Sequence, residues 1–118
     1  MTWIVHGPTQ SISYQAHEQG FDVFMGNFRG VYPRKMAAHK DPKTYWDYNL
    51  DHFGKYDVAA FISKIHSLKV AELYEMLKAE SHGVYSDEDI YKIIDQKLKI
   101  TFIGHSLGGM VLPMYLIH

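Results

Sequence analysis

The sequence predicts an α/β fold, in which short parallel strands are joined by crossover helices within one partial domain over residues 1–118. Two observations favour this fold. The apolar stretches Phe21–Met25 and Ile100–Ile103 are short and each is followed by a glycine, as expected of strands buried on both faces. Between them, apolar residues recur at helical spacing over Asp57–Leu68, which predicts a helix of the kind that connects parallel strands.

The composition excludes several classes of function. Twelve basic and 13 acidic residues give a net charge of −1, so nothing favours binding to nucleic acid or to an anionic membrane surface. Cysteine is absent, which excludes disulfides and thiolate chemistry. The eight histidines lack metal-ligand spacing, and we expect neither a metal nor a cofactor. No stretch has the length of a membrane span or a leader peptide, so the sequence leaves the cellular compartment open.

The amino-terminal stretch gives one open assignment and one helix. Trp3–Val5 is compatible with a strand or with a loop that buries a tryptophan. His6 and Gly7 have the residue types of an oxyanion-hole pair, but Pro8 follows and has no N–H to donate, so we do not assign them that role. Ser13–Gln19 is predicted to be a short helix, which Gly20 ends.

The loop Gly26–Gly30 follows the first predicted strand, at the edge where α/β folds usually bind ligands. Arg29 in this loop has two possible roles: it binds an anion, or it pairs with backbone carbonyls or a carboxylate and fixes the loop. We favour the second role. The following segment, Tyr32–His52, is predicted to be irregular, with aromatic side chains that anchor it by packing.

Two further helical patterns precede the second strand. The helix at Asp57–Leu68 continues as Val70–Ala79, and the sequence does not decide whether it bends between the two parts. Asp57 is expected to stabilise the start of this helix rather than to act as a catalytic acid. Ser86 is predicted to cap another helix, whose apolar stripe includes Ile90.

The pentapeptide Gly104–Gly108, Gly-His-Ser-Leu-Gly, stands between the predicted strand Ile100–Ile103 and the apolar stretch Met110–Ile117. A strand, Gly-x-Ser-x-Gly and a helix form the nucleophile elbow, in which a sharp turn exposes a strained serine. This pattern predicts Ser106 as nucleophile and the backbone N–H of Leu107 as an oxyanion donor. The alternative is an ordinary strand-to-helix turn. The last helix contains a proline and is predicted to kink there.

Three stretches together carry a resemblance to a known family: Gly20–Gly30, Tyr45–Ala60 and Gly104–Gly109. In this order they resemble the acid lipases, which are α/β-hydrolases and include gastric and lysosomal acid lipases, yeast steryl ester hydrolases and plant relatives. The resemblance implies a partial α/β-hydrolase fold with the nucleophile elbow near the carboxyl end. It also implies hydrolysis of lipid esters such as triacylglycerols or steryl esters. Glu72–Lys97 looks like a lineage-specific insertion.

The chain departs from this family in length. Family members are several times longer, and their catalytic acid and histidine lie far beyond the elbow, whereas only twelve residues follow Ser106 here. His118 stands at the wrong end of the last helix for a general base. We therefore expect a fragment of a catalytic domain that is inactive as an isolated chain, with any membrane or lipid-droplet contact made by other parts. The alternative is a non-catalytic module that binds another protein.

Overall fold

The computed structural model describes residues 3–31 and 41–118, and its regular structure within these ranges is helical. The elements in chain order are α1 (Ile12–Glu18), η1 (Pro42–Thr44), α2 (Leu50–His52), η2 (Phe53–Val58), α3 (Ala59–Glu80), α4 (Asp87–Lys97) and α5 (Leu107–Ile117).

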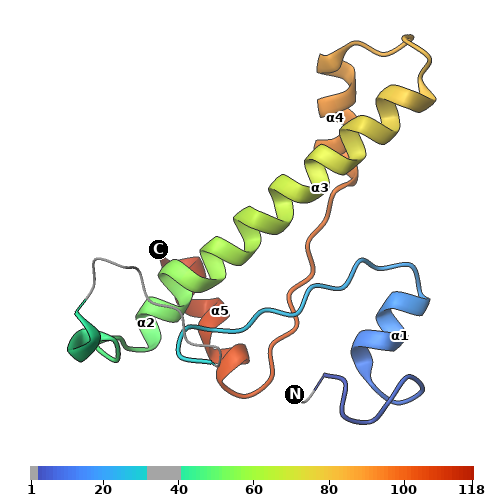
Figure 1. Ribbon diagram of the computed structural model, residues 1–118. Coiled ribbons are helices and arrows are strands. Elements are labelled where there is room, and N and C mark those ends of the chain that lie inside the picture. The colour runs from blue at the N-terminus through green and yellow to red at the C-terminus, as the bar shows by residue number, and fades with distance from the viewer. Residues whose placement is uncertain (1–2, 32–40) are drawn as a thin grey trace.

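A long central helix organises the molecule. α2, η2 and α3 follow one another without a break, so the chain is helical from Leu50 to Glu80, with a π-helical segment at η2. α5 packs against η2 and α2 at one end of this helix, and α4 folds back along the other end (Figure 1). α3 is continuous through residues 68–70, so the two helical patterns that the sequence predicts there belong to one helix.

Two helices begin at side-chain caps that the residue types explain. The Asn49 side chain accepts a hydrogen bond from the His52 N–H, and the Ser86 hydroxyl accepts one from the Asp89 N–H. In both cases the third residue of the helix bonds back to the N–H of the cap residue, which satisfies two otherwise unpaired donors. The predicted cap at Ser86 is confirmed. The predicted first helix is confirmed as α1, displaced by one residue.

The predicted parallel strands are wrong for the described part of the chain, and with them the α/β fold class and the partial α/β-hydrolase fold. Phe21–Met25 and Ile100–Ile103 are non-helical, but neither belongs to a β-ladder, and Trp3–Val5 forms a turn. A strand exists only when a neighbour accepts its backbone hydrogen bonds. Apolar composition favoured extended backbone at both stretches, but the described residues supply no paired neighbour.

Within residues 3–31 and 41–118, the buried apolar residues form two separate clusters rather than one core. Val58 of η2 and Val111 of α5 are fully buried where these two helices meet. Ile90 and Ile94 of α4 are buried on the side where α4 packs against α3. The first cluster holds the helix that follows the predicted elbow, and the second holds the far end of the central helix.

The chain is more extended than a compact domain of its size. Its radius of gyration is 17.9 Å, whereas a compact chain of this length has about 13.5 Å. Its accessible surface is 9274 Å², against about 6,600 Å² for a folded monomer of 13.7 kDa. Large apolar side chains make up part of this excess, among them Phe21, Ile103 and Ile117. The fold therefore leaves a wide apolar surface in contact with solvent.

Candidate active site

Ser106 occupies a strained turn directly before α5. Its backbone angles are φ 54° and ψ −121°, and it is one of two described residues other than glycine that have a positive φ. L-residues avoid this region because the side chain crowds the backbone, and such strain gathers at functional sites. The serine is exposed to solvent. The turn therefore has the sharpness and the exposure that the elbow pattern predicts, although no strand leads into it.

Of the two glycines that flank Ser106 in the motif, Gly104 is required by close contacts and Gly108 is not. A side-chain carbon on Gly104 would overlap the carbonyl oxygen of Gly108 and lie 2.6 Å from the backbone nitrogen of Gly109. Glycine is required there because the two ends of the turn touch. A side chain on Gly108 would meet nothing within 4 Å, so close contact requires glycine at position 104 but not at position 108.

The first backbone donors of α5 are not equivalent. The N–H of Gly108 donates to the His105 carbonyl at 3.0 Å, and the N–H of Gly109 donates to the Ser106 carbonyl at 3.0 Å. The N–H of Leu107 has no acceptor among the described residues. It stands at the amino end of a helix, where the helix dipole favours negative charge. Of these three donors, Leu107 is the one that can still bind an oxyanion.

The neighbours of Ser106 supply no general base within residues 3–31 and 41–118. The ring of His105 packs edge-on against the Trp3 ring, with 6.4 Å between their centroids. Among these residues, none forms a hydrogen bond with the Ser106 hydroxyl. A serine hydroxyl without a base is a weak nucleophile at neutral pH.

His118 lies at the opposite end of α5 from Ser106. Eleven helical residues separate the two, a distance of about 16 Å along the helix axis. The Nε2 atom of His118 lies 2.6 Å from Oδ1 of Asp51 on α2. This histidine therefore joins the carboxyl end of α5 to α2, and it does not reach the serine, in agreement with the expectation from the sequence.

The position of α5 is fixed by close backbone contact with η2. A side-chain carbon on Gly54 would lie 2.7 Å from Cβ of Met114 and 2.8 Å from the backbone nitrogen of Tyr115. Gly54 is buried, and Val58 and Val111 fill the same contact. Pro113 lies inside α5, which continues to Ile117, and the predicted kink remains a prediction. Because Gly54 has no side chain, the backbone of α5 lies in direct contact with the backbone of η2.

The role left open for Arg29 is decided in favour of pairing with a carboxylate. Its Nη2 donates to Oδ1 of Asp57 at 2.7 Å, its Nε donates to both carboxylate oxygens, and its backbone N–H donates to Oδ2 at 3.0 Å. The Tyr48 and Tyr56 rings flank the guanidinium at 5.8 and 5.6 Å. The bond from Asp57 raises the pKa of Arg29. Asp57 therefore anchors the loop at η2 and does not cap a helix start.

The sequence did not identify Asp57 as the partner of Arg29, because 28 residues separate the two in the chain. Aromatic packing accompanies the ion pair: Phe28 contacts the rings of Phe53 and Phe61, at 5.2 and 6.0 Å between centroids. The one available signal was that the loop and the Tyr45–Ala60 segment both belong to the stretches that carry the resemblance. The expected aromatic anchoring is confirmed for residues 45–53, and residues 32–40 lie outside the described part of the chain.

The described residues hold no group of three or more potential metal ligands. None of the helices in the described ranges combines the length and the apolar character needed to cross a membrane.

The chain is similar in sequence to several lipases. It is 37% identical to the tear acid lipase-like protein of Mesocricetus auratus over 111 residues, which are 92% of this chain and 21% of that protein. It is 31% identical to triacylglycerol lipase 2 of Arabidopsis thaliana over 113 residues, 94% of this chain and 21% of the relative. With the gastric triacylglycerol lipase of Rattus norvegicus it shares 34% identity over 65 residues, 53% of this chain and 16% of the relative.

No family profile and no solved structure matches the chain. The relatives are lipases, and the chain belongs to the acid lipase family. It spans about a fifth of the length of these relatives.

Proposed function

We propose that this chain is the nucleophile-bearing part of a lipase that hydrolyses carboxylic esters of lipids, such as triacylglycerols or steryl esters. Ser106 is the nucleophile and the N–H of Leu107 is one donor of the oxyanion hole. The observation that carries the proposal is the backbone of Ser106, held at φ 54° in an exposed turn at the amino end of α5. The named relatives are lipases, which supports the same reaction class.

The Ser106 hydroxyl and the Leu107 N–H would act at successive stages of ester hydrolysis. The Ser106 Oγ attacks the carbonyl carbon of the ester and gives a tetrahedral intermediate whose oxygen carries negative charge. The Leu107 N–H donates a hydrogen bond to that oxygen, where the positive end of the α5 dipole also acts. Collapse of the intermediate releases the alcohol, and water then hydrolyses the acyl-serine. The first and last steps each need a base that takes a proton.

We further propose that the isolated chain lacks this base and does not turn over esters. Among the described residues, no histidine forms a hydrogen bond with the Ser106 hydroxyl, and His118 is bonded to Asp51 about 16 Å away along α5. The wide apolar surface supports the same proposal, because a complete catalytic domain buries such side chains.

Labelling with a fluorophosphonate tests the assignment of the nucleophile. The probe is applied to a full-length lipase polypeptide that contains this segment, in three forms: unchanged, Ser106→Ala, and Ser63→Ala as an exposed-serine control on α3. We expect Ser106→Ala to abolish labelling and Ser63→Ala to retain it. Labelling that survives Ser106→Ala would refute the assignment. Hydrolysis of a p-nitrophenyl ester by the isolated chain above background, lost in Ser106→Ala, would refute the claim of incompleteness.

A non-catalytic module that binds another protein is the second candidate. The observation that favours it is the exposed apolar surface, which includes Phe21 at 59%, Leu116 at 72% and Ile117 at 80% of full exposure. Exposed patches of this kind mark interaction sites. This candidate predicts that the full-length polypeptide resists the fluorophosphonate while the chain still forms a stable complex, so the labelling experiment separates the two functions.

A further inference from the structure

A groove lies along the middle of α3, where Tyr91 of α4 folds back on it. Its volume is about 430 Å³, within the range typical of sites for small ligands or side chains. α3 lines it from His66 to Glu75, about 13 Å of helix, and Tyr91 closes it from α4. Val70 and Ala71 are its aliphatic lining residues.

Two tyrosines stack at the Glu75 end of the groove. The rings of Tyr74 and Tyr91 are stacked, with 5.3 Å between their centroids and 28° between their planes, and Tyr91 is half exposed. Lys78 already lies over the Tyr74 ring at 5.0 Å, which shows that this ring system accepts a cation. The same lysine bonds to the Tyr74 hydroxyl and pairs with Asp87, so it is engaged within the chain.

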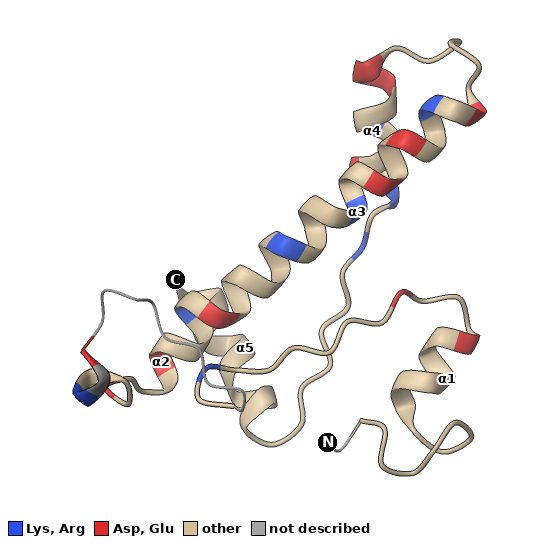
Figure 2. Cartoon of the chain, viewed as in Figure 1, with Lys and Arg blue, Asp and Glu red and all other residues tan. Residues whose placement is uncertain are grey.

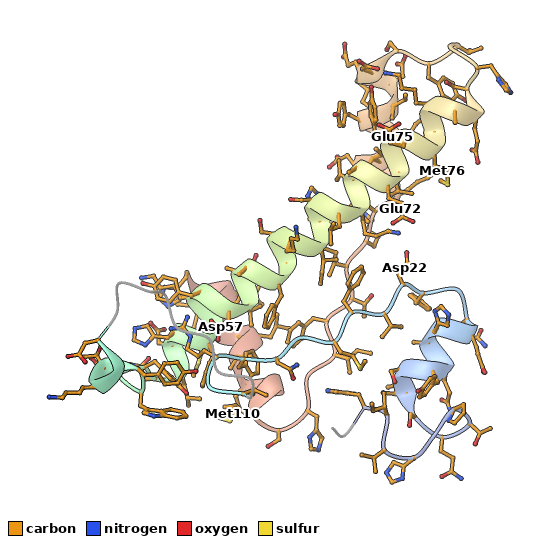
Figure 3. The ribbon with its side chains drawn as sticks, viewed as in Figure 1. Asp22, Asp57, Glu72, Glu75, Met76 and Met110 are labelled. Atoms are coloured by element: carbon orange, nitrogen blue, oxygen red, sulfur yellow. The ribbon has the colours of Figure 1, made fainter. Side chains whose placement is uncertain are left out.

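Glu75 lines the groove and has no hydrogen-bond or ion-pair partner among the described residues. The carboxylates around it are engaged: Glu72 with Lys69, Asp87 with Lys78, and Glu88 with Lys92. Figure 3 shows Glu72 and Glu75 on successive turns of α3. A carboxylate beside the half-exposed ring of Tyr91 and the aliphatic side chains of Val70 and Ala71 can bind a cation that also has an aliphatic stem.

Acidic residues are concentrated in the part of the chain that contains one end of the groove. Residues 72–97 carry seven carboxylates and three lysines, whereas the rest of the chain carries six carboxylates and nine basic residues. Acidic residues gather over α4 and the last turns of α3 (Figure 2). A negative region attracts a basic partner and orients it before contact.

We propose that this groove is a docking site for a basic amphipathic segment of another polypeptide. An arginine or lysine of that segment pairs with Glu75 and lies against the Tyr91 ring. Its apolar residues cover Val70 and Ala71. The site does not involve Ser106, so it is independent of the proposed lipase function.

The probe is a fluorescein-labelled, capped peptide of ten residues in which arginine alternates with leucine, and its binding is followed by fluorescence anisotropy. We expect Glu75→Gln to weaken binding about threefold to fivefold, as for the loss of one exposed ion pair. Tyr91→Ala should weaken it by a similar factor, and Tyr91→Phe should retain it because the ring remains. Glu80→Gln, an exposed acid on the same helix but outside the groove, should change the affinity less than twofold.

A second peptide, a variant at Ser106 and a measurement of self-association complete the test. The same peptide with glutamine in place of arginine should bind at least fivefold more weakly, and Ser106→Ala should bind the arginine peptide as the unchanged chain does. Equal losses in Glu75→Gln and Glu80→Gln would overturn the proposal, because they would indicate diffuse attraction. Equal binding of the glutamine peptide would also overturn it. Sedimentation that shows Glu75-dependent self-association would assign the groove to a second copy instead.

Discussion

The guanidinium of Arg29 donates three hydrogen bonds to the two carboxylate oxygens of Asp57, and the backbone N–H of Arg29 donates a fourth. The Asp57 side chain is only 12% exposed, so this is a partly buried pair that joins the loop after residue 25 to η2. Together with the contacts of Phe28 it determines where the loop lies on the central helix.

Asp57→Asn is expected to destabilise the chain by about 1–3 kcal/mol, because it leaves a partly buried guanidinium without its charged acceptor. Urea unfolding followed by circular dichroism measures the change. Asp22→Asn, which removes the exposed partner of Lys69, is the control and should have a smaller effect. Amide exchange at Arg29 should also accelerate in Asp57→Asn, because its N–H loses a carboxylate acceptor. Unchanged exchange would mean that the pair does not fix the loop.

Gly54→Ala is expected to destabilise the contact between η2 and α5 by about 1–3 kcal/mol. The added methyl would meet backbone of α5 at Tyr115, which cannot rotate away, so the helices must separate. Gly108→Ala is the matched control, because it adds the same methyl to a helix with nothing within 4 Å and should be neutral or stabilising by up to about 1 kcal/mol. Equal unfolding free energies for the two variants would contradict this packing.

Local signals in the sequence predicted the longer helices and the cap at Ser86. They missed the cap at Asn49 and the helical residues Leu50–His52, which lie in a segment predicted to be irregular, and they missed the partners of extended segments. Ser86 followed by acids predicts the start of α4, and the apolar spacing after Asp57 predicts α3, because caps and helix faces depend on residues a few positions apart. Phe21–Met25 has the composition of a strand, but pairing depends on a distant neighbour that composition does not reveal. For the same reason, the sequence did not reveal that Asp57 is the partner of Arg29. The turn at Ser106 was predictable because it depends on neighbouring residues, above all on Gly104, whose missing side chain lets the two ends of the turn touch.

His118→Gln is expected to raise the pKa of Asp51. The hydrogen bond from His118 is the main cause that lowers this pKa below its usual value, and the charges of Lys55 and His52 act in the same direction. Because the folded-state pKa is lowered, the stabilisation by ionised Asp51 is present above about pH 4 and is lost as pH falls through the lowered value. Titration of the Asp51 carboxyl by NMR in both forms measures the shift. His66→Gln on α3 is the control and should leave the titration unchanged.

Ser106→Gly is expected to be more stable than Ser106→Ala, by about 1 kcal/mol. Both variants remove the hydroxyl, but alanine keeps the side-chain carbon that makes φ 54° and ψ −121° unfavourable, whereas glycine adopts these angles without strain. The greater freedom of glycine in the unfolded chain offsets part of the gain. Urea unfolding of the two variants gives the difference directly. Equal stabilities would show that the turn relaxes around residue 106, and an exposed serine in a relaxed turn would lack the geometry on which the proposed nucleophile depends.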